Sequence, residues 1–92
     1  MFKVGKKYKV RDLNYFKNNP EDFIYRGNEV FAANLPGNEH FMTSSMLRKK
    51  EVTIHDIFKS EKHVDFITIE EDGFVWEPWM LVPSSNTIME TE

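Results

Sequence analysis

Apolar and polar residues alternate in short runs along this chain, most clearly in its C-terminal third. The segments Val52–His55 and Asp65–Glu70 alternate with a period of two and are rich in β-branched residues. This pattern is typical of strands that bury one face and expose the other. The alternation slips at residues 56–58, which predicts a β-bulge or the end of a strand. We therefore expect a strongly bent antiparallel sheet in this region.

A tight hairpin is expected after the second of these strands. The acidic segment Glu70–Gly73 forms a polar turn, in which the glycine would supply a positive φ angle. Residues 74–77 then form the returning strand, which ends at Pro78 because proline donates no ladder hydrogen bond. Residues 84–92 are expected to be a frayed acidic tail, so that a single domain spans residues 1–83.

The N-terminal part of the chain predicts one strand and a long excursion. Apolar residues alternate with lysines over Lys6–Leu13, which predicts the first strand, whereas Phe2 and Val4 would fold over one end of the core. The segment Asn19–Asp22 combines a capping residue, a proline at the first helical position and acids in the first turn. It predicts a short helix that stops at residues 26–28.

The middle of the chain predicts a strand and a single helical turn. The strand is expected at Glu29–Leu35 and a turn at residues 36–38. Ser44 would cap a helical turn that carries Met46 and Leu47 inward. The whole pattern predicts an all-β, or β-rich α+β, domain: a small antiparallel barrel of about five strands with a short helical turn in the first long connection. Its core should contain Tyr8, Val10, Val52, Ile54, Ile67, Ile69 and Trp76.

Three stretches of the chain, FKVGKKYKV, FMTSSMLRKKEVTI and DGFVWEPWML, resemble small SH3-like barrel proteins of tailed bacteriophages, most of them hypothetical proteins. The features shared with them are Gly5, Met46-Leu47, Val52-Thr53-Ile54, Gly73 and Trp76. Lys6 stands where these proteins usually have aspartate, and residues 14–40 have no counterpart. Because that group has no shared activity, the resemblance implies an SH3-like fold and a phage-like origin but no chemistry.

The composition indicates a single small domain without disulfides or a membrane span. Ninety-two residues make one domain with a thin core, for which eight Phe, three Tyr and two Trp compensate. The absence of cysteine excludes disulfides and suits a reducing compartment. No apolar run approaches the roughly 18 residues of a membrane span, and the basic N-terminus lacks the apolar part of a signal peptide. We expect a cytoplasmic protein, in the host cell if a phage encodes it, with no membrane partner.

The residues that carry chemistry show no catalytic or metal-binding pattern. His40, His55 and His63 are not at metal-ligand spacing, and no cysteine assists them. Ser44 lacks the glycines of a nucleophile elbow, and the scattered glycines form no phosphate loop. We therefore expect no cofactor, no metal and no enzymatic activity.

Binding to a protein is the expected function, and aromatic residues are its expected anchors. Trp76 and Trp79 cannot both point into one small core, so either one is an interface anchor or the two cap opposite ends of the barrel. The candidate partner-binding residues are Trp76, Trp79, Tyr15, Phe16, Tyr25, Glu70, Glu71 and Asp72. The sequence thus predicts an accessory protein that binds and inhibits or redirects a host or viral protein, for example in host takeover or anti-defence.

Nucleic-acid binding is the alternative. Basic residues gather in positions 1–17 and acidic residues in positions 61–92, although the net charge is only −3. The candidate residues for a nucleic acid are Lys7, Lys9, Arg11, Arg48, Lys49 and Lys50. The simpler expectation is that the terminal strands pair and that their opposite charges neutralise one another across the sheet.

Overall fold

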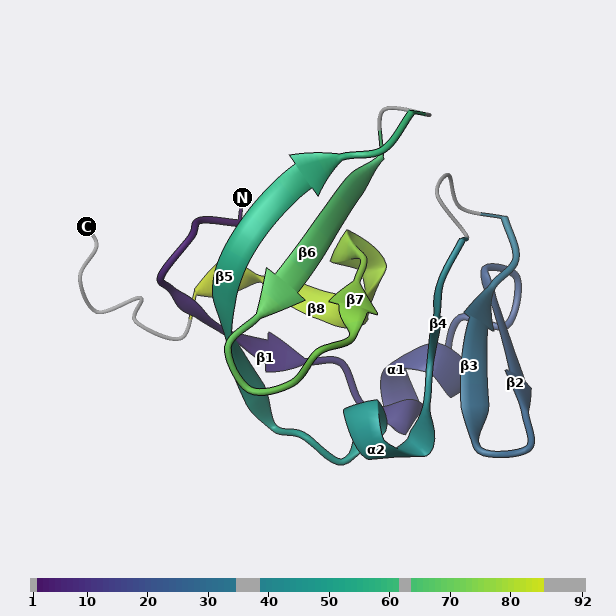
Figure 1. Ribbon diagram of the computed structural model, residues 1–92. Helices are drawn as coiled ribbons and strands as arrows, with labels where there is room; N and C mark the ends of the chain where they lie inside the picture. The colour runs from purple at the N-terminus through teal and green to yellow at the C-terminus, as the bar shows by residue number, and fades with distance from the viewer. Residues whose placement is uncertain (1, 35–38, 62–63, 86–92) are drawn as a thin grey trace.

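The computed structural model describes residues 2–34, 39–61 and 64–85, and its largest element is a five-stranded antiparallel sheet (Figure 1). The strands follow the order β7-β6-β5-β1-β8 and curl into a half-barrel. They are β1 (Lys7–Val10), β5 (Glu51–Lys59), β6 (Asp65–Ile69), β7 (Val75–Trp76) and β8 (Leu81–Ser85). This architecture confirms the predicted small antiparallel β domain with a short helix in its first long connection.

A second, three-stranded sheet lies beside the half-barrel and was not predicted. It has the order β2-β3-β4, with β4 on the side nearer the half-barrel (Figure 1). Its strands are β2 (Phe23–Arg26), β3 (Glu29–Ala32) and β4 (Phe41–Met42). The part of the chain that the structure describes also contains three short helices: α1 (Leu13–Lys17), α2 (Ser44–Leu47) and the 3₁₀ helix η1 (Pro78–Met80).

The prediction of a helix that starts at Asn19 is wrong: helix α1 lies earlier and ends at Lys17, and residues 23–26 form strand β2 instead. The side chain of Asp12 accepts a hydrogen bond from the backbone N–H of Tyr15 at 3.0 Å. Asn19 instead closes the end of this helix, where its side-chain amide donates to the carbonyl of Tyr15 at 2.7 Å. The predicted first strand is correspondingly shorter and ends at Val10. Likewise Thr43, not Ser44, caps α2.

The segment predicted to stop a helix is the turn of a β-hairpin. Gly27 and Asn28, between β2 and β3, have φ angles of 57° and 72°. Two consecutive positive φ angles are typical of the type I′ turn that joins two antiparallel strands. The predicted strand from Glu29 ends at Ala32, and the predicted turn at residues 36–38 lies outside the described residues.

Two predictions about the half-barrel are confirmed in outline and corrected in detail. The sequence predicted a bulge or a strand end at residues 56–58; the β5–β6 ladder shifts register slightly earlier, between Ile54 and Asp56, and the strand continues to Lys59. The turn after β6 does not use a positive φ at Gly73. Instead Oδ1 of Asp72 accepts from the backbone N–H of Phe74 at 2.9 Å, which forms the turn through a side chain.

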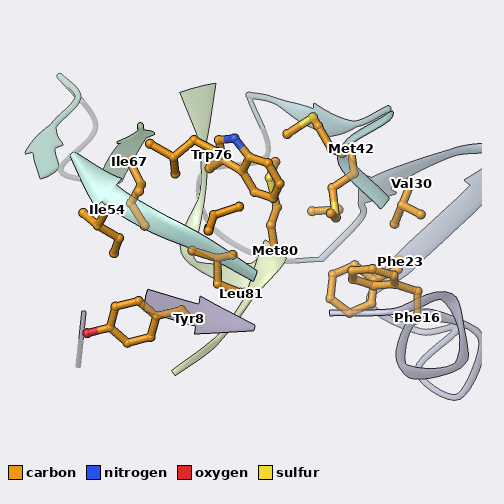
Figure 2. Close-up of a cluster of buried hydrophobic side chains, with 14 residues drawn as sticks. Tyr8, Phe16, Phe23, Val30, Met42, Ile54, Ile67, Trp76, Met80 and Leu81 are labelled. Atoms are coloured by element: carbon orange, nitrogen blue, oxygen red, sulfur yellow. The ribbon is translucent and has the colours of Figure 1, made fainter. Parts of the chain in front are cut away.

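The two sheets share one hydrophobic core. Six of the seven predicted core residues are buried, and Val10 packs against them at the margin. The inward position predicted for Met46 is also confirmed, whereas the sequence missed the other half of the core: Phe16, Phe23, Val30, Ala32, Met42, Met80 and Leu81 are buried as well. Figure 2 shows Trp76 and Met80 between the side chains of the half-barrel and those of the small sheet.

The two ends of the domain match the expectation only in part. Phe2 packs edge-on against Tyr8, with ring centroids 4.9 Å apart, as predicted. Val4 is 58% exposed, so it does not cover the core. Strand β8 pairs with β1 and continues to Ser85, two residues into the predicted tail, and residues 86–92 lie outside the described residues.

Candidate functional site

Two of the predicted surface aromatics lie inside the protein. Trp76 is fully buried and Phe16 is 2% exposed. Trp76 lies opposite Ile67 in the β6–β7 ladder and belongs to the core. Phe16 packs edge-on against Phe23 with a centroid distance of 4.8 Å. The prediction that these two residues contact a partner is wrong, because a core of this size needs its largest rings.

Trp79 and Tyr15 lie half-buried at the joint between the two sheets. The ring of Trp79 lies 5.9 Å from that of Phe16 and 5.5 Å from that of Phe23. Tyr15 packs edge-on against Phe16 at 5.4 Å, and the guanidinium of Arg11 lies 4.0 Å from the Tyr15 centroid. This is a cation–π geometry. Both rings therefore have a structural role that accounts for most of their surface.

A buried carboxylate, which the sequence reasoning did not identify, links the two sheets. Glu77 is 0% exposed. Its Oε1 accepts from the indole N–H of Trp79 at 2.9 Å, and its Oε2 lies 2.7 Å from Nδ1 of His40, the residue before β4. His40 in turn packs edge-on against Phe66 of β6. The sequence did carry a signal for this buried acid, because Glu77 stands between two tryptophans in WEPW. An acid in so apolar a segment needs polar partners if it is buried.

The acidic turn after β6 is engaged within the protein. The backbone N–H of Thr53 donates to both carboxylate oxygens of Glu71, at 2.9 and 3.0 Å. Partial burial acts to raise the pKa of Glu71, but the hydrogen bonds from Thr53 and the charge of Lys7 outweigh it and lower the pKa. Asp72 forms the turn itself. Of the three acids predicted to contact a partner, Glu70 is therefore the one whose side chain is exposed and forms no hydrogen bond or ion pair within the described structure.

The predicted basic residues alternate with acids. The Nζ atom of Lys7 lies 4.0 Å from Oε1 of Glu51, which also faces Lys9 in the β1–β5 ladder. The Nζ atom of Lys49 lies 3.9 Å from Oδ2 of Asp72. The terminal strands β1 and β8 do pair, as expected, but β8 carries no charged residue, so β5 and the acidic turn supply the neutralising charges. This arrangement does not favour a continuous basic face.

A groove between the helices and the β2–β3 hairpin brings together two of the predicted residues. It has a volume of about 450 Å³. Its lining residues are Leu13, Tyr25, Asn28, Ser44, Leu47 and Arg48. Tyr25 is 43% exposed, and its hydroxyl donates to Oδ1 of Asn28 at 3.3 Å, which orients the ring. The groove therefore has apolar walls, hydroxyl and amide groups, and one cation.

The charge around this groove is positive. Arg48 is exposed, and the ammonium of Lys17 lies 5.5 Å from the centroid of the Tyr25 ring. Neither cation forms an ion pair with any residue in the described part of the chain. A second hollow of similar volume carries charges of both signs. It is lined by Glu39, Phe58, Lys59, Ser60, Glu61 and Phe66.

The described residues offer neither a metal site nor a membrane-spanning helix. Within residues 2–34, 39–61 and 64–85, no three His, Asp or Glu side chains lie close enough together to hold a metal ion. No helix in these same ranges is long and apolar enough to cross a membrane. The chain has no significant match to a family model, to a curated protein or to a solved structure. The groove is therefore the candidate functional site on its own chemistry.

Proposed function

We propose that this chain is a small accessory protein that acts by binding another protein, not by catalysis. In line with the phage resemblance, the partner is a host or viral protein in the cytoplasm, whose activity is blocked or redirected. The observation that supports this function is the groove at Tyr25 and Arg48, where apolar walls adjoin cations that form no ion pair among the described residues. A concave apolar surface with a few polar groups is the usual form of a binding site.

The lining of the groove defines the chemistry of the partner. Leu13, Leu47 and Tyr25 accept an apolar side chain, and Ser44 and Asn28 offer hydrogen bonds to a backbone. The cations at the rim favour carboxylates and disfavour bases. The partner segment is therefore an exposed peptide with an apolar anchor next to Asp or Glu.

Affinity capture from a bacterial lysate, followed by mass spectrometry, tests this proposal with two charge reversals. Arg48→Glu places a carboxylate in the groove and should reduce recovery of the partner at least about tenfold, since like charges at an interface cost several kcal/mol. Lys50→Glu makes the same change two residues away, outside the groove, and should leave recovery unchanged. Equal recovery with both variants, or no specific partner of the unmodified protein, would contradict the proposal.

The nucleic-acid alternative makes a different prediction. It requires salt-sensitive retention on a DNA or RNA column, because phosphate contacts release counterions. The ion pairs of Lys7 and Lys49 leave fewer free cations for phosphate than the sequence suggested. Absence of retention at low salt would remove this alternative.

A further inference from the structure

The outer face of the three-stranded sheet carries an exposed apolar row. Ile24 lies directly opposite Phe31 in the β2–β3 ladder, and Phe31 lies opposite Phe41 in the β3–β4 ladder. Residues that face each other across antiparallel strands project from the same side of a sheet. Ile24 is 43% and Phe41 40% exposed, and the Phe31 and Phe41 rings stack at 4.9 Å. The neighbouring positions Val30 and Met42 project from the other side and are fully buried.

The same face carries two opposite charges next to the hairpin turn. Arg26 and Glu29 are paired in the β2–β3 ladder and lie two residues from Ile24 and Phe31, so they share the outer face. Although they are directly opposite, they form no ion pair with each other or with any other residue that the structure describes. As far as the described residues extend, both charges are therefore available to groups on another molecule.

A simple symmetry between two copies of the chain would let each of these two ladder pairs contact itself. A twofold axis that runs along the outer face, parallel to β2 and β3 and between them, exchanges the two strands of two facing copies. It places Ile24 on Phe31 of the second copy, and Arg26 on Glu29 of the second copy. Each contact then occurs twice, as an isologous interface requires.

We propose that the outer face of the β2–β3–β4 sheet is a homodimer interface, with the reciprocal Ile24–Phe31 contacts at its centre, Phe41 at its margins and two reciprocal Arg26–Glu29 ion pairs at one end. The self-complementary charge is the reason to choose a second copy as the occupant. The strands are short, so the buried area is small and the dimer should be reversible and concentration-dependent. The groove at Tyr25 opens on the other side of the hairpin, so this proposal does not depend on the proposed function.

Sedimentation equilibrium of the full chain over a wide concentration range tests the interface. The unmodified protein should show a monomer–dimer equilibrium. Arg26→Glu makes each ion pair a contact between two carboxylates, and Glu29→Arg makes each a contact between two guanidinium groups. Each variant alone should therefore dimerise at least about tenfold more weakly. In an equimolar mixture, a heterodimer regains one attractive pair of carboxylate and guanidinium at each of the two contacts, and should recover the unmodified affinity.

Two further variants separate this interface from other effects. Lys50→Glu reverses an exposed charge away from the face and should leave dimerisation unchanged. Ile24→Thr keeps a β-branched residue in the strand but removes apolar area, and should weaken the dimer about tenfold. Circular dichroism checks that each variant is folded. A monomer at every concentration, reversals that dimerise like the unmodified protein, or a mixture of folded variants that stays monomeric would each overturn the proposal.

Discussion

Among single residues, Glu77 is the side chain whose burial most needs explanation. A buried carboxylate is tolerated when polar partners replace the water around its oxygens. Here the indole of Trp79 and the imidazole of His40 each contact one oxygen of Glu77, from two segments that are far apart in the chain. The contact therefore holds the small sheet against the half-barrel as well as satisfying the acid.

Removal of His40 should accordingly destabilise the protein. His40→Ala leaves one oxygen of Glu77 without its partner and should lower the free energy of unfolding by about 2 kcal/mol, measured by urea denaturation at neutral pH. His55→Ala removes an exposed histidine of β5 and should cost less than about 0.5 kcal/mol. Similar losses for the two variants would show that the buried contact contributes little.

Glu71 should make stability depend on pH. Its pKa is lowered from the ordinary value of 4.5, so the charged form is favoured by folding. This contribution is present above the pKa of the unfolded chain and is lost as the pH falls through the lower pKa of the folded chain. Glu71→Gln should therefore lower stability at neutral pH, by less than about 1 kcal/mol because the side chain is exposed and screened, and the difference should disappear in acid.

The adjacent acid provides the control for this pH dependence. Glu70→Gln removes the same charge from an exposed side chain that accepts no hydrogen bond from Thr53. Its stability difference from the unmodified protein should be close to zero from neutral to acid pH. A matching pH profile for the two variants would contradict the role assigned to the Thr53–Glu71 contact.

At the scale of elements, the β2–β3 hairpin depends on the backbone at its turn. Gly27 has a φ angle of 57°, and a Cβ atom at this position would meet nothing within 4 Å. The cost of Gly27→Ala is therefore one of backbone strain, about 1 kcal/mol. Gly73 has equally open space and no positive φ, so Gly73→Ala should be neutral or slightly stabilising. Thermal unfolding of both variants measures the difference, and a larger loss at Gly73 would contradict the turn geometry.

The success of prediction from sequence differed between the two sheets for a physical reason. Residues 52–55 of β5 and the residues of β6 alternate strictly, so their type and inward faces were predicted correctly. In β2 the alternation is hidden, because Phe23, Ile24 and Tyr25 are all apolar although only the first is buried. The local signal of Asn19-Pro20 for a helix start then outweighed the turn signal of Gly27-Asn28. Tertiary pairing with β3 decided the outcome.

At the scale of the whole molecule, the candidate site arises where distant segments meet. The start of α1, the β2–β3 hairpin and the end of α2 each contribute part of the groove. Tyr25 and Arg48 were both singled out in the sequence, but for two different functions, because the path of residues 14–47 was not predicted. Burial could be inferred from hydrophobic pattern for half of the core, whereas the grouping of surface residues required the fold.

The three fully buried methionines of the core have a consequence for chemical durability. Met42, Met46 and Met80 are at most 1% exposed, and Met80 lies between the two sheets (Figure 2). Thioethers adapt their shape to an irregular gap, but oxidation converts them to polar sulfoxides that a dry interior does not accept. Peroxide should reach them only when the two sheets separate, and a chain oxidised in that open state would not close again. The lifetime of the protein under oxidative stress is thus set by how often the two sheets part.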